Sequence, residues 1–178
     1  MRTLGRSLAA LLRAGDLVIL SGGLGAGKTT LTQGIGDGLG VRGPITSPTF
    51  VIARVHPPVP RAAGGPGEIA ADLAELAGPR PALVHADAYR LGSALELDDL
   101  DLDTDTAASV TVVEWGEGLA EGLAADRLEI TITPETAGLT GGDGDDLAAA
   151  APRTVRISAI GERWEGVKLP LASAADRL

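Results

Sequence analysis

The chain has 178 residues, a length that suits one compact domain spanning 1–178, with 44% hydrophobic and 22% charged residues as in soluble globular proteins. A formal net charge of −9 argues against unaided nucleic-acid binding, because proteins that grip a duplex or a tRNA usually carry a basic face. The absence of cysteine excludes disulfides and thiolate metal sites and fits a reducing cytoplasm, and no apolar run approaches the roughly 20 residues of a membrane span.

Near the N-terminus, leucines recur at helical spacing, which predicts an amphipathic helix over residues 4–12. Arg6 and Arg13 interrupt this stretch, so a secretory signal is the weaker interpretation. The apolar run 17–20 that follows predicts a buried strand.

A complete phosphate-binding loop, G-x-x-x-x-G-K-[ST], occupies residues 22–29 directly after that strand. Its glycines let backbone N–H groups approach phosphate oxygens, and the helix that begins at its end adds a partial positive charge. In this pattern Lys28 reaches the β- and γ-phosphates and the Thr29 hydroxyl holds Mg²⁺. The chain is therefore expected to bind ATP or GTP.

Residues 28–39 predict a helix with Leu31, Ile35 and Leu39 on one face, although three glycines weaken it and tertiary packing must hold it. A polar turn at 44–49 leads to a strand predicted over 50–55. Residues 56–81 are rich in Pro, Gly and Ala and are interpreted as a surface insertion, with one short helix near 69–76.

The rest of the sequence predicts four further strands. Residues 82–86 form a buried strand that ends in Asp87, a short helix follows Ser93, and a strand at 110–113 ends in Glu114. Alternating strands at 128–133 and 153–160 flank a loop at 138–152. The order predicts an α/β fold of the three-layer P-loop NTPase type, with a mainly parallel sheet and antiparallel strands added near the C-terminus.

Ligands of open α/β sheets lie beyond the carboxyl ends of the strands, where this order places the phosphate loop, Asp87 and Glu114. Mg²⁺ prefers oxygen ligands, so one carboxylate with Thr29 is a sufficient protein contribution, and the other carboxylate could orient or deprotonate the attacking water. Which acid has which role stays open, as does a simpler role for either as a helix cap or surface charge.

Between these elements, Ser47-Pro48-Thr49 lies where many P-loop proteins place a switch that senses the γ-phosphate, and either hydroxyl could face Mg²⁺ or phosphate. His85, on an apolar strand, is interpreted as a buried structural residue. Trp115 is expected to pack in the core, although its place beside Glu114 leaves ligand contact open. The acidic stretch 96–105 is either a solvated surface or a docking face for a basic partner.

Four motifs in this order resemble the TsaE (YjeE) family, small bacterial ATPases needed for threonylcarbamoyl modification of tRNA. They are Gly-Ala-Gly-Lys-Thr-Thr at 25–30, Ser-Pro-Thr-Phe at 47–50, His-x-Asp-x-Tyr-Arg at 85–90 and Val-Glu-Trp-Gly-Glu at 113–117, within a resemblance that covers 4–160. The resemblance implies Mg²⁺-dependent ATP hydrolysis in a complex with TsaD and TsaB. It also implies that the partners hold the tRNA, in agreement with the acidic charge of this chain.

The resemblance also assigns roles to residues. It places Asp87 in a Walker-B-like position and makes Glu114 an acid that holds Mg²⁺ or positions water. Lys28, Asp87 and Glu114 form the expected catalytic set, and Thr29, Asp87 and Glu114 the expected metal set. The expected nucleotide-binding residues are Gly22, Leu24, Gly25, Ala26, Gly27, Lys28, Thr29, Thr30, Ser47, Thr49 and Arg153.

Two other classes of protein share the phosphate loop. A small-molecule or nucleotide kinase would use Asp87 as the base toward a substrate hydroxyl, but it usually needs an arginine-bearing lid, and only Arg90, Arg153 and Arg156 are candidates. A GTPase-like module would read guanine with an Asn-Lys-x-Asp motif, which this chain cannot form because it contains no asparagine.

Overall fold

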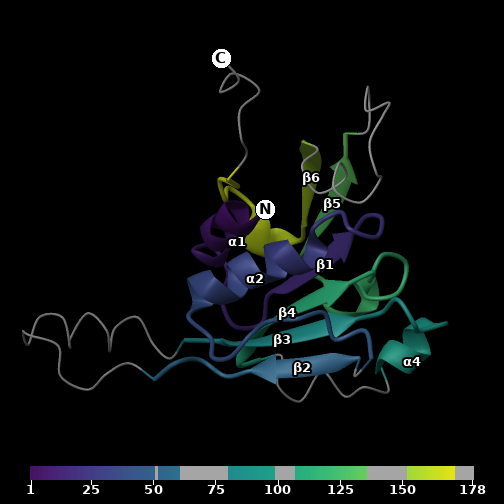
Figure 1. Cartoon of the computed structure of the whole chain (residues 1–178). Helices are drawn as coiled ribbons and strands as arrows, with labels where there is room; N and C mark the ends of the chain where they lie inside the picture. Colours follow the sequence, from purple (N-terminus) through teal and green to yellow (C-terminus); the bar gives the residue numbers. More distant parts are fainter. Residues whose placement is uncertain (51, 61–79, 99–106, 136–151, 171–178) are drawn as a thin grey trace, which may run out of the picture.

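A six-stranded mixed sheet forms the centre of the protein in a computed structural model, with strand order β2-β3-β4-β1-β5-β6 (Figure 1). The structure describes residues 1–178 except 51, 61–79, 99–106, 136–151 and 171–178. The predicted short helix near 69–76, the loop at 138–152 apart from its last residue, and most of the acidic stretch lie outside the described residues. The strands are β1 (Leu17–Ser21), β2 (Ala53–His56), β3 (Ala82–Asp87), β4 (Ser109–Glu114), β5 (Arg127–Pro134) and β6 (Arg153–Ile160).

The four central strands, β3, β4, β1 and β5, run parallel, which confirms the mainly parallel α/β core. Strands β1 and β4 are buried along their whole length, as their mainly apolar sequences predict for strands covered on both faces. The register aligns Leu20 of β1 with Glu114 of β4, and Glu114 with Asp87 of β3. The carboxyl ends of these three strands therefore meet at one edge of the sheet.

One antiparallel strand closes each side of the sheet. Strand β6 pairs with β5 as the sequence predicts, whereas the second antiparallel strand is β2 on the opposite side, and β5 itself is parallel to β1. The prediction of a strand from Phe50 is wrong, because β2 begins only at Ala53. Ile52 has a φ of 69°, which interrupts extended backbone, and Phe50 lies in a turn with its side chain exposed. His56, assigned to the insertion, is the buried last residue of β2.

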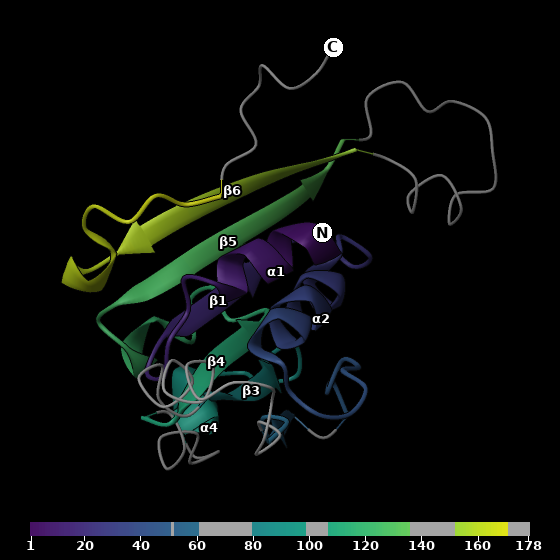
Figure 2. The same cartoon turned by 90° about the vertical axis from the view of Figure 1, so that its left-hand side faces the viewer.

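Helices α1 (Arg2–Ala9) and α2 (Lys28–Leu39) lie side by side over one face of the sheet (Figures 1 and 2). A side chain at Gly34 would collide with the backbone carbonyl of Arg2, and one at Gly5 would collide with the carbonyl of Leu31. Gly34 lowers the helix propensity of α2 but, together with Gly5 of α1, permits the close approach of the two helices. Leu31, Ile35 and Leu39 are buried, as predicted, against the sheet side of this helix pair.

The opposite face of the sheet has a thinner cover. Leu97 of α4 (Ala94–Asp98) and Ala120, just before the 3₁₀ helix η1 (Glu121–Leu123), pack with apolar side chains of β1, β3 and β4. Ser93 caps α4 by accepting a hydrogen bond from the Glu96 backbone N–H, as the capping-box pattern predicts. A second 3₁₀ helix, η2 (Glu162–Trp164), follows β6. Of the helices in the described part of the chain, none combines the length and apolar character that crossing a bilayer requires.

Candidate nucleotide site

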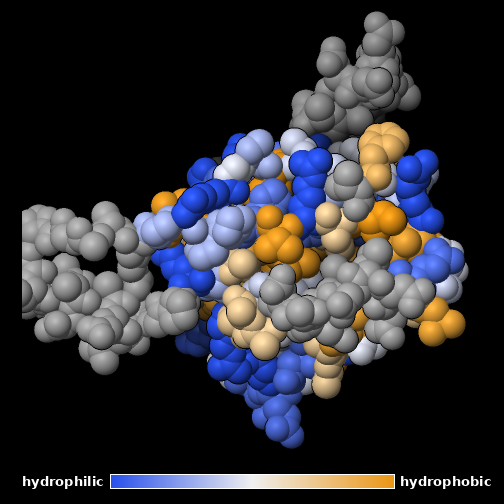
Figure 3. Space-filling view, turned by 90° about the horizontal axis from the view of Figure 1, so that it is seen from below, coloured by the Kyte–Doolittle hydropathy of each residue, from blue (hydrophilic) through white to orange (hydrophobic). Residues whose placement is uncertain are grey.

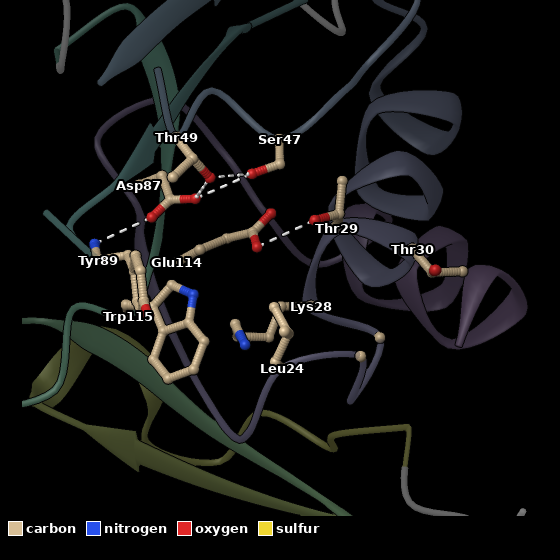
Figure 4. Close-up of a pocket in the computed structure, with 12 residues that line it drawn as sticks. Leu24, Lys28, Thr29, Thr30, Ser47, Thr49, Asp87, Tyr89, Glu114 and Trp115 are labelled. Atoms are coloured by element: carbon tan, nitrogen blue, oxygen red, sulfur yellow. Dashed lines mark hydrogen bonds between the residues drawn. The ribbon is translucent and has the colours of Figure 1, made fainter. Parts of the chain in front are cut away.

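A pocket of about 460 Å³ opens where the carboxyl ends of β1, β3 and β4 meet (Figure 4). The phosphate loop, the start of α2, the 47–49 turn and the residues after β3 and β4 supply its walls. The pocket therefore brings together segments that the sequence predicted would converge at this edge. Its lining residues are Leu24, Gly25, Gly27, Lys28, Thr29, Thr30, Ser47, Thr49, Asp87, Tyr89, Glu114 and Trp115.

The phosphate loop has its conformation because glycines stand at the positions with unusual backbone angles. Gly22 has a φ of 138°, and a side chain there would collide with the carbonyl of Ile132 on β5. Gly27 has a φ of 106° and forms the N-cap of α2, so that helix α2 begins at Lys28 and directs its N-terminus toward the pocket. Such a helix start favours bound anions, because its first N–H groups have no partner within the helix.

The Lys28 side chain reaches back over the loop. Its Nζ donates hydrogen bonds to the carbonyl oxygens of Gly22 at 2.8 Å and Gly23 at 3.0 Å, and it lies 3.6 Å from the centre of the Trp115 ring. Burial lowers the pKa of Lys28, while the nearby carboxylates Glu114 and Asp87 act in the opposite direction. Phosphate oxygens would offer the ammonium stronger, charged acceptors than these carbonyls do.

Glu114 is buried, and its two carboxylate oxygens have different partners. The Thr29 hydroxyl donates to Oε2 at 3.0 Å, and Nε2 of His85 lies 2.8 Å from Oε1. Thr29 is the second residue of α2, while His85 is in the middle of β3. The carboxylate thus links the start of the helix to the core of the sheet.

Asp87 is also buried, but its partners come from the segment before β2. The hydroxyls of Ser47 and Thr49 both donate to Oδ2, at 2.9 Å and 2.5 Å, and the backbone N–H of Tyr89 donates to Oδ1 at 2.9 Å (Figure 4). The two hydroxyls are themselves 2.7 Å apart. The predicted switch segment is therefore tied to the carboxylate at the end of β3.

Three predicted site residues are part of the loop's support and do not line the cavity. Ala26 is fully buried, and its carbonyl accepts a hydrogen bond from Nε of Arg153 at 2.9 Å. A Cβ at Gly27 would lie 3.6 Å from that same nitrogen. Gly22 contacts Lys28 through its carbonyl. Arg153, 127 positions along the chain from Ala26, thus lies against the outer side of the phosphate loop.

Sequence reasoning missed two contributions to the site and left a third open. Tyr89 lines the pocket, and its ring lies 5.0 Å from that of Trp115. Trp115 itself is only half-buried, with a φ of 60°, and faces the pocket, so it is not a core residue. His85 is fully buried, as predicted, but it also contacts Glu114. The spacing His-x-Asp was the available signal, since residues two apart on a strand share a face.

The donor atoms around the pocket suit Mg²⁺. The polar side-chain atoms of Thr29, Ser47, Thr49, Asp87 and Glu114 are all oxygens, which Mg²⁺ prefers over nitrogen or sulfur. Within the described ranges, no group of three or more His, Cys, Asp or Glu side chains could hold a metal by itself. Mg²⁺ generally keeps several waters and shares its coordination with substrate phosphates, so it needs few protein ligands.

Comparisons with known proteins show which family the chain resembles. A family model described as "Threonylcarbamoyl adenosine biosynthesis protein TsaE" matches residues 1–139. The tRNA threonylcarbamoyladenosine biosynthesis protein TsaE of Streptomyces coelicolor is 53% identical over 165 residues, which cover 92% of this chain and 93% of the relative. The Bacillus subtilis protein of the same name is 32% identical over 165 residues, covering 92% and 82% of the two chains.

A solved structure extends the likeness to the fold. The crystal structure of Bacillus subtilis YdiB has a TM-score of 0.57 and 28% sequence identity to this chain, covering 92% of it and 81% of the neighbour. Together with the matched sequence, this supports a P-loop NTPase type of α/β fold. The chain belongs to the TsaE family, whose members take part in the biosynthesis of threonylcarbamoyladenosine in tRNA.

Proposed function

We propose that this protein binds ATP with Mg²⁺ in the 460 Å³ pocket and hydrolyses it to support threonylcarbamoyladenosine modification of tRNA by TsaD and TsaB. The single observation that carries the proposal is the convergence of Lys28 and Thr29 of the phosphate loop with the carboxylates of Asp87 and Glu114. The absence of asparagine from the sequence argues against guanine recognition and so favours ATP over GTP.

The contacts favour different roles for the two acids. Thr29 gives its hydroxyl hydrogen to Glu114, which leaves the lone pairs of the Thr29 oxygen available to Mg²⁺ and supports a role for Glu114 beside the metal. Asp87 accepts from Ser47 and Thr49, so it is suited to couple the attacking water or the γ-phosphate to the switch segment. When bound, Mg²⁺ would neutralise charge that develops on the phosphates.

The phosphate loop itself would supply binding. Lys28 would exchange the carbonyls of Gly22 and Gly23 for β- and γ-phosphate oxygens, and the loop and helix N–H groups would hold the remaining oxygens. Arg153 would support the loop from its outer side through the carbonyl of Ala26. These contacts would position the phosphates. Hydrolysis without partners is expected to be slow because no described arginine lines the pocket to stabilise the transition state.

Exposed apolar side chains near the pocket support a protein partner. Leu24 of the phosphate loop is 93% exposed and Phe50, directly after the switch segment, is 86% exposed. Seen from the side of β2 and α4, apolar side chains in orange and tan alternate with hydrophilic patches (Figure 3). Large exposed apolar side chains beside a pocket are candidates for contact with a protein partner, whereas the net charge of −9 disfavours direct tRNA contact. We expect the partners to hold the tRNA and the complex to act in the cytoplasm.

The kinase alternative gains little from the structure. The Arg90 guanidinium lies 5.3 Å from the centre of the Phe50 ring, and Arg153 contacts Ala26. Neither of them, nor Arg156, lines the pocket. Among the described residues there is thus no arginine-bearing cover over the expected phosphate position, as a kinase would need.

The test is ATP hydrolysis and tRNA modification measured with the protein alone and with TsaD and TsaB added. We expect slow hydrolysis alone, a partner-dependent increase, and loss of modification in Lys28→Ala and Asp87→Ala. The matched control is Lys168→Ala, which removes the only other lysine of the chain, at an exposed position far along the sequence, and should behave as wild type. Normal modification with Lys28→Ala, or transfer of phosphate to an added small molecule, would contradict the proposal.

A further inference from the structure

His85 is a polar residue in the buried part of the sheet. It lies in the middle of β3, is 0% exposed, and has Leu83 and Val112 as buried neighbours on its strand and on β4. A hydrophobic side chain of similar size would fill this position without burying polar nitrogens, which destabilise a fold when they lack partners. Packing alone therefore does not account for a histidine at this position.

The Glu114 carboxylate offers a reason. Its Oε1 lies 2.8 Å from His85 Nε2, and its Oε2 accepts from Thr29 at 3.0 Å. With one partner on each oxygen, the plane of the carboxylate is fixed from both sides. If the His85 contact were removed, Oε1 would be left buried without this partner and the carboxylate could rotate away from Thr29.

The contact defines which ring nitrogen carries hydrogen. A carboxylate oxygen only accepts, so Nε2 must donate to Oε1. Nδ1, the other ring nitrogen, is buried and has no hydrogen-bond partner among the described residues. Among the described residues, the hydrogen bond to Glu114 is the one that orients the ring, which also lies 6.5 Å from the ring of His56.

We propose that His85 is a positioning residue that holds Glu114 in the orientation that supports Mg²⁺ at Thr29. This inference rests on the proposed Mg²⁺–ATP function and adds to it a residue outside the pocket wall. Polar groups that orient the residues around a metal commonly affect metal affinity or activity by about 10–100-fold when they are mutated. His85 does not touch the nucleotide, so its effect should appear in the Mg²⁺ requirement and not in binding of the nucleotide alone.

The test compares His85→Met, which removes the donor at similar volume, with His85→Gln, whose side-chain amide can still donate to Glu114. ATP binding is measured calorimetrically with and without Mg²⁺. We expect His85→Met to raise, by about 10–100-fold, the Mg²⁺ concentration that gives half of the Mg²⁺-dependent gain in ATP affinity, with little change in the affinity for ATP without Mg²⁺. His85→Gln should need a Mg²⁺ concentration close to that of wild type. The control is Thr111→Val on β4, which removes a buried polar atom that has no hydrogen-bond partner among the described residues.

A measurement on the wild-type protein keeps the proposal testable if His85→Met does not fold. Long-range ¹H–¹⁵N correlation of the imidazoles should find hydrogen on His85 Nε2, and addition of Mg²⁺ to the ATP-bound protein should shift this resonance more than that of His56. A hydrogen on Nδ1 alone, an unchanged Mg²⁺ requirement in His85→Met, or no rescue by His85→Gln would overturn the proposal. A wild-type protein that ignores Mg²⁺ would instead overturn the proposed function, while the His85 tautomer would still report on the contact.

Discussion

Asp87 and Glu114 occupy matching positions at the ends of neighbouring parallel strands, yet the two carboxylates are held by different parts of the molecule. The partners of Glu114, Thr29 and His85, come from helix α2 and the buried sheet. The side-chain partners of Asp87 come from the turn at 47–49, where Ser47 is exposed. One carboxylate is thus fixed by the core, whereas the other is fixed by a surface segment.

This difference suggests how one pocket can both hold a metal and respond to a ligand. A carboxylate fixed by core residues presents the same geometry before and after binding, which is what a metal position requires. A carboxylate held by hydroxyls from a surface turn changes its partners when that turn moves, which is what a γ-phosphate sensor requires. Variants of each carboxylate and of its partners separate these two roles.

The largest effect is expected for Glu114→Gln. If Glu114 supports Mg²⁺ through Thr29, loss of its charge should lower the rate of partner-stimulated ATP hydrolysis on the order of 100-fold or more. ATP affinity without Mg²⁺ should be unchanged or tighter, because a negative charge near the phosphates is removed. Steady-state hydrolysis and calorimetry check both parts, with Glu117→Gln, an exposed glutamate three residues on, as the control. A wild-type rate of hydrolysis in Glu114→Gln would show that Glu114 does not support Mg²⁺.

A smaller loss is expected for Asp87→Asn. The amide keeps an acceptor for Ser47 and Thr49 but loses the charge, so hydrolysis should fall by about 10–100-fold while the Mg²⁺ requirement stays near that of wild type. Exchange of the backbone amide hydrogens of residues 46–50 with solvent should become faster in this variant. Asp37→Asn, at a surface ion pair with Arg2 and Arg6, is the comparison. A raised Mg²⁺ requirement in Asp87→Asn would reverse the two assignments.

Removal of a single switch hydroxyl should have a still smaller effect. A hydrogen bond to a carboxylate contributes about 1.5 kcal/mol or more, so Thr49→Val should lower hydrolysis by roughly tenfold, and Ser47→Ala by about the same or less. Each effect should largely vanish in the Asp87→Asn background, because the partner charge is already gone. Thr46→Val changes an exposed neighbour in the same turn and should leave hydrolysis unaltered. Fully additive losses would indicate that the hydroxyls do not act through Asp87.

The smallest expected effect concerns the thermal stability of the protein and the buried side chain of His56. Burial lowers the pKa of His56, with the nearby charges of His85 and Arg54 in the same direction and a hydrogen bond to the Arg42 backbone opposing them. The unfolded chain takes up a proton near pH 6.5, before the folded protein does, so stability is full above that pH and falls as the pH drops toward the lowered folded value. His56→Gln should therefore lose less thermal stability than wild type between pH 7 and pH 5. An equal loss would contradict this origin.

The sequence predicted those elements whose limits are set by local chemistry. Helix α2 spans 28–39 as predicted, because the phosphate loop fixes its start and Gly40, with a φ of 70°, ends it. Strand β6 has its predicted limits because its alternating side chains mark one half-exposed strand. Asp87 and Glu114 were found for a general reason: acids at the ends of parallel strands converge at one edge of a sheet.

The contacts that the sequence did not predict depend on which strands become neighbours. The bond between His85 and Glu114 exists because β3 and β4 pair in a register that only the folded sheet defines. The start of β2 was placed too early, because Ile52 looks like a strand residue but takes a positive φ. Tyr89 was not assigned to the pocket, since nothing local shows that its ring meets that of Trp115.

The proposed function requires that this pocket binds ATP through the phosphate loop together with Mg²⁺. Calorimetric titration of ATP into the wild-type protein, with and without Mg²⁺, and into Lys28→Ala and Lys168→Ala tests it most directly. We expect saturable ATP binding that Mg²⁺ strengthens, loss of binding in Lys28→Ala and wild-type binding in Lys168→Ala. Equal ATP binding by Lys28→Ala and wild type, or no binding by the wild type, would contradict it.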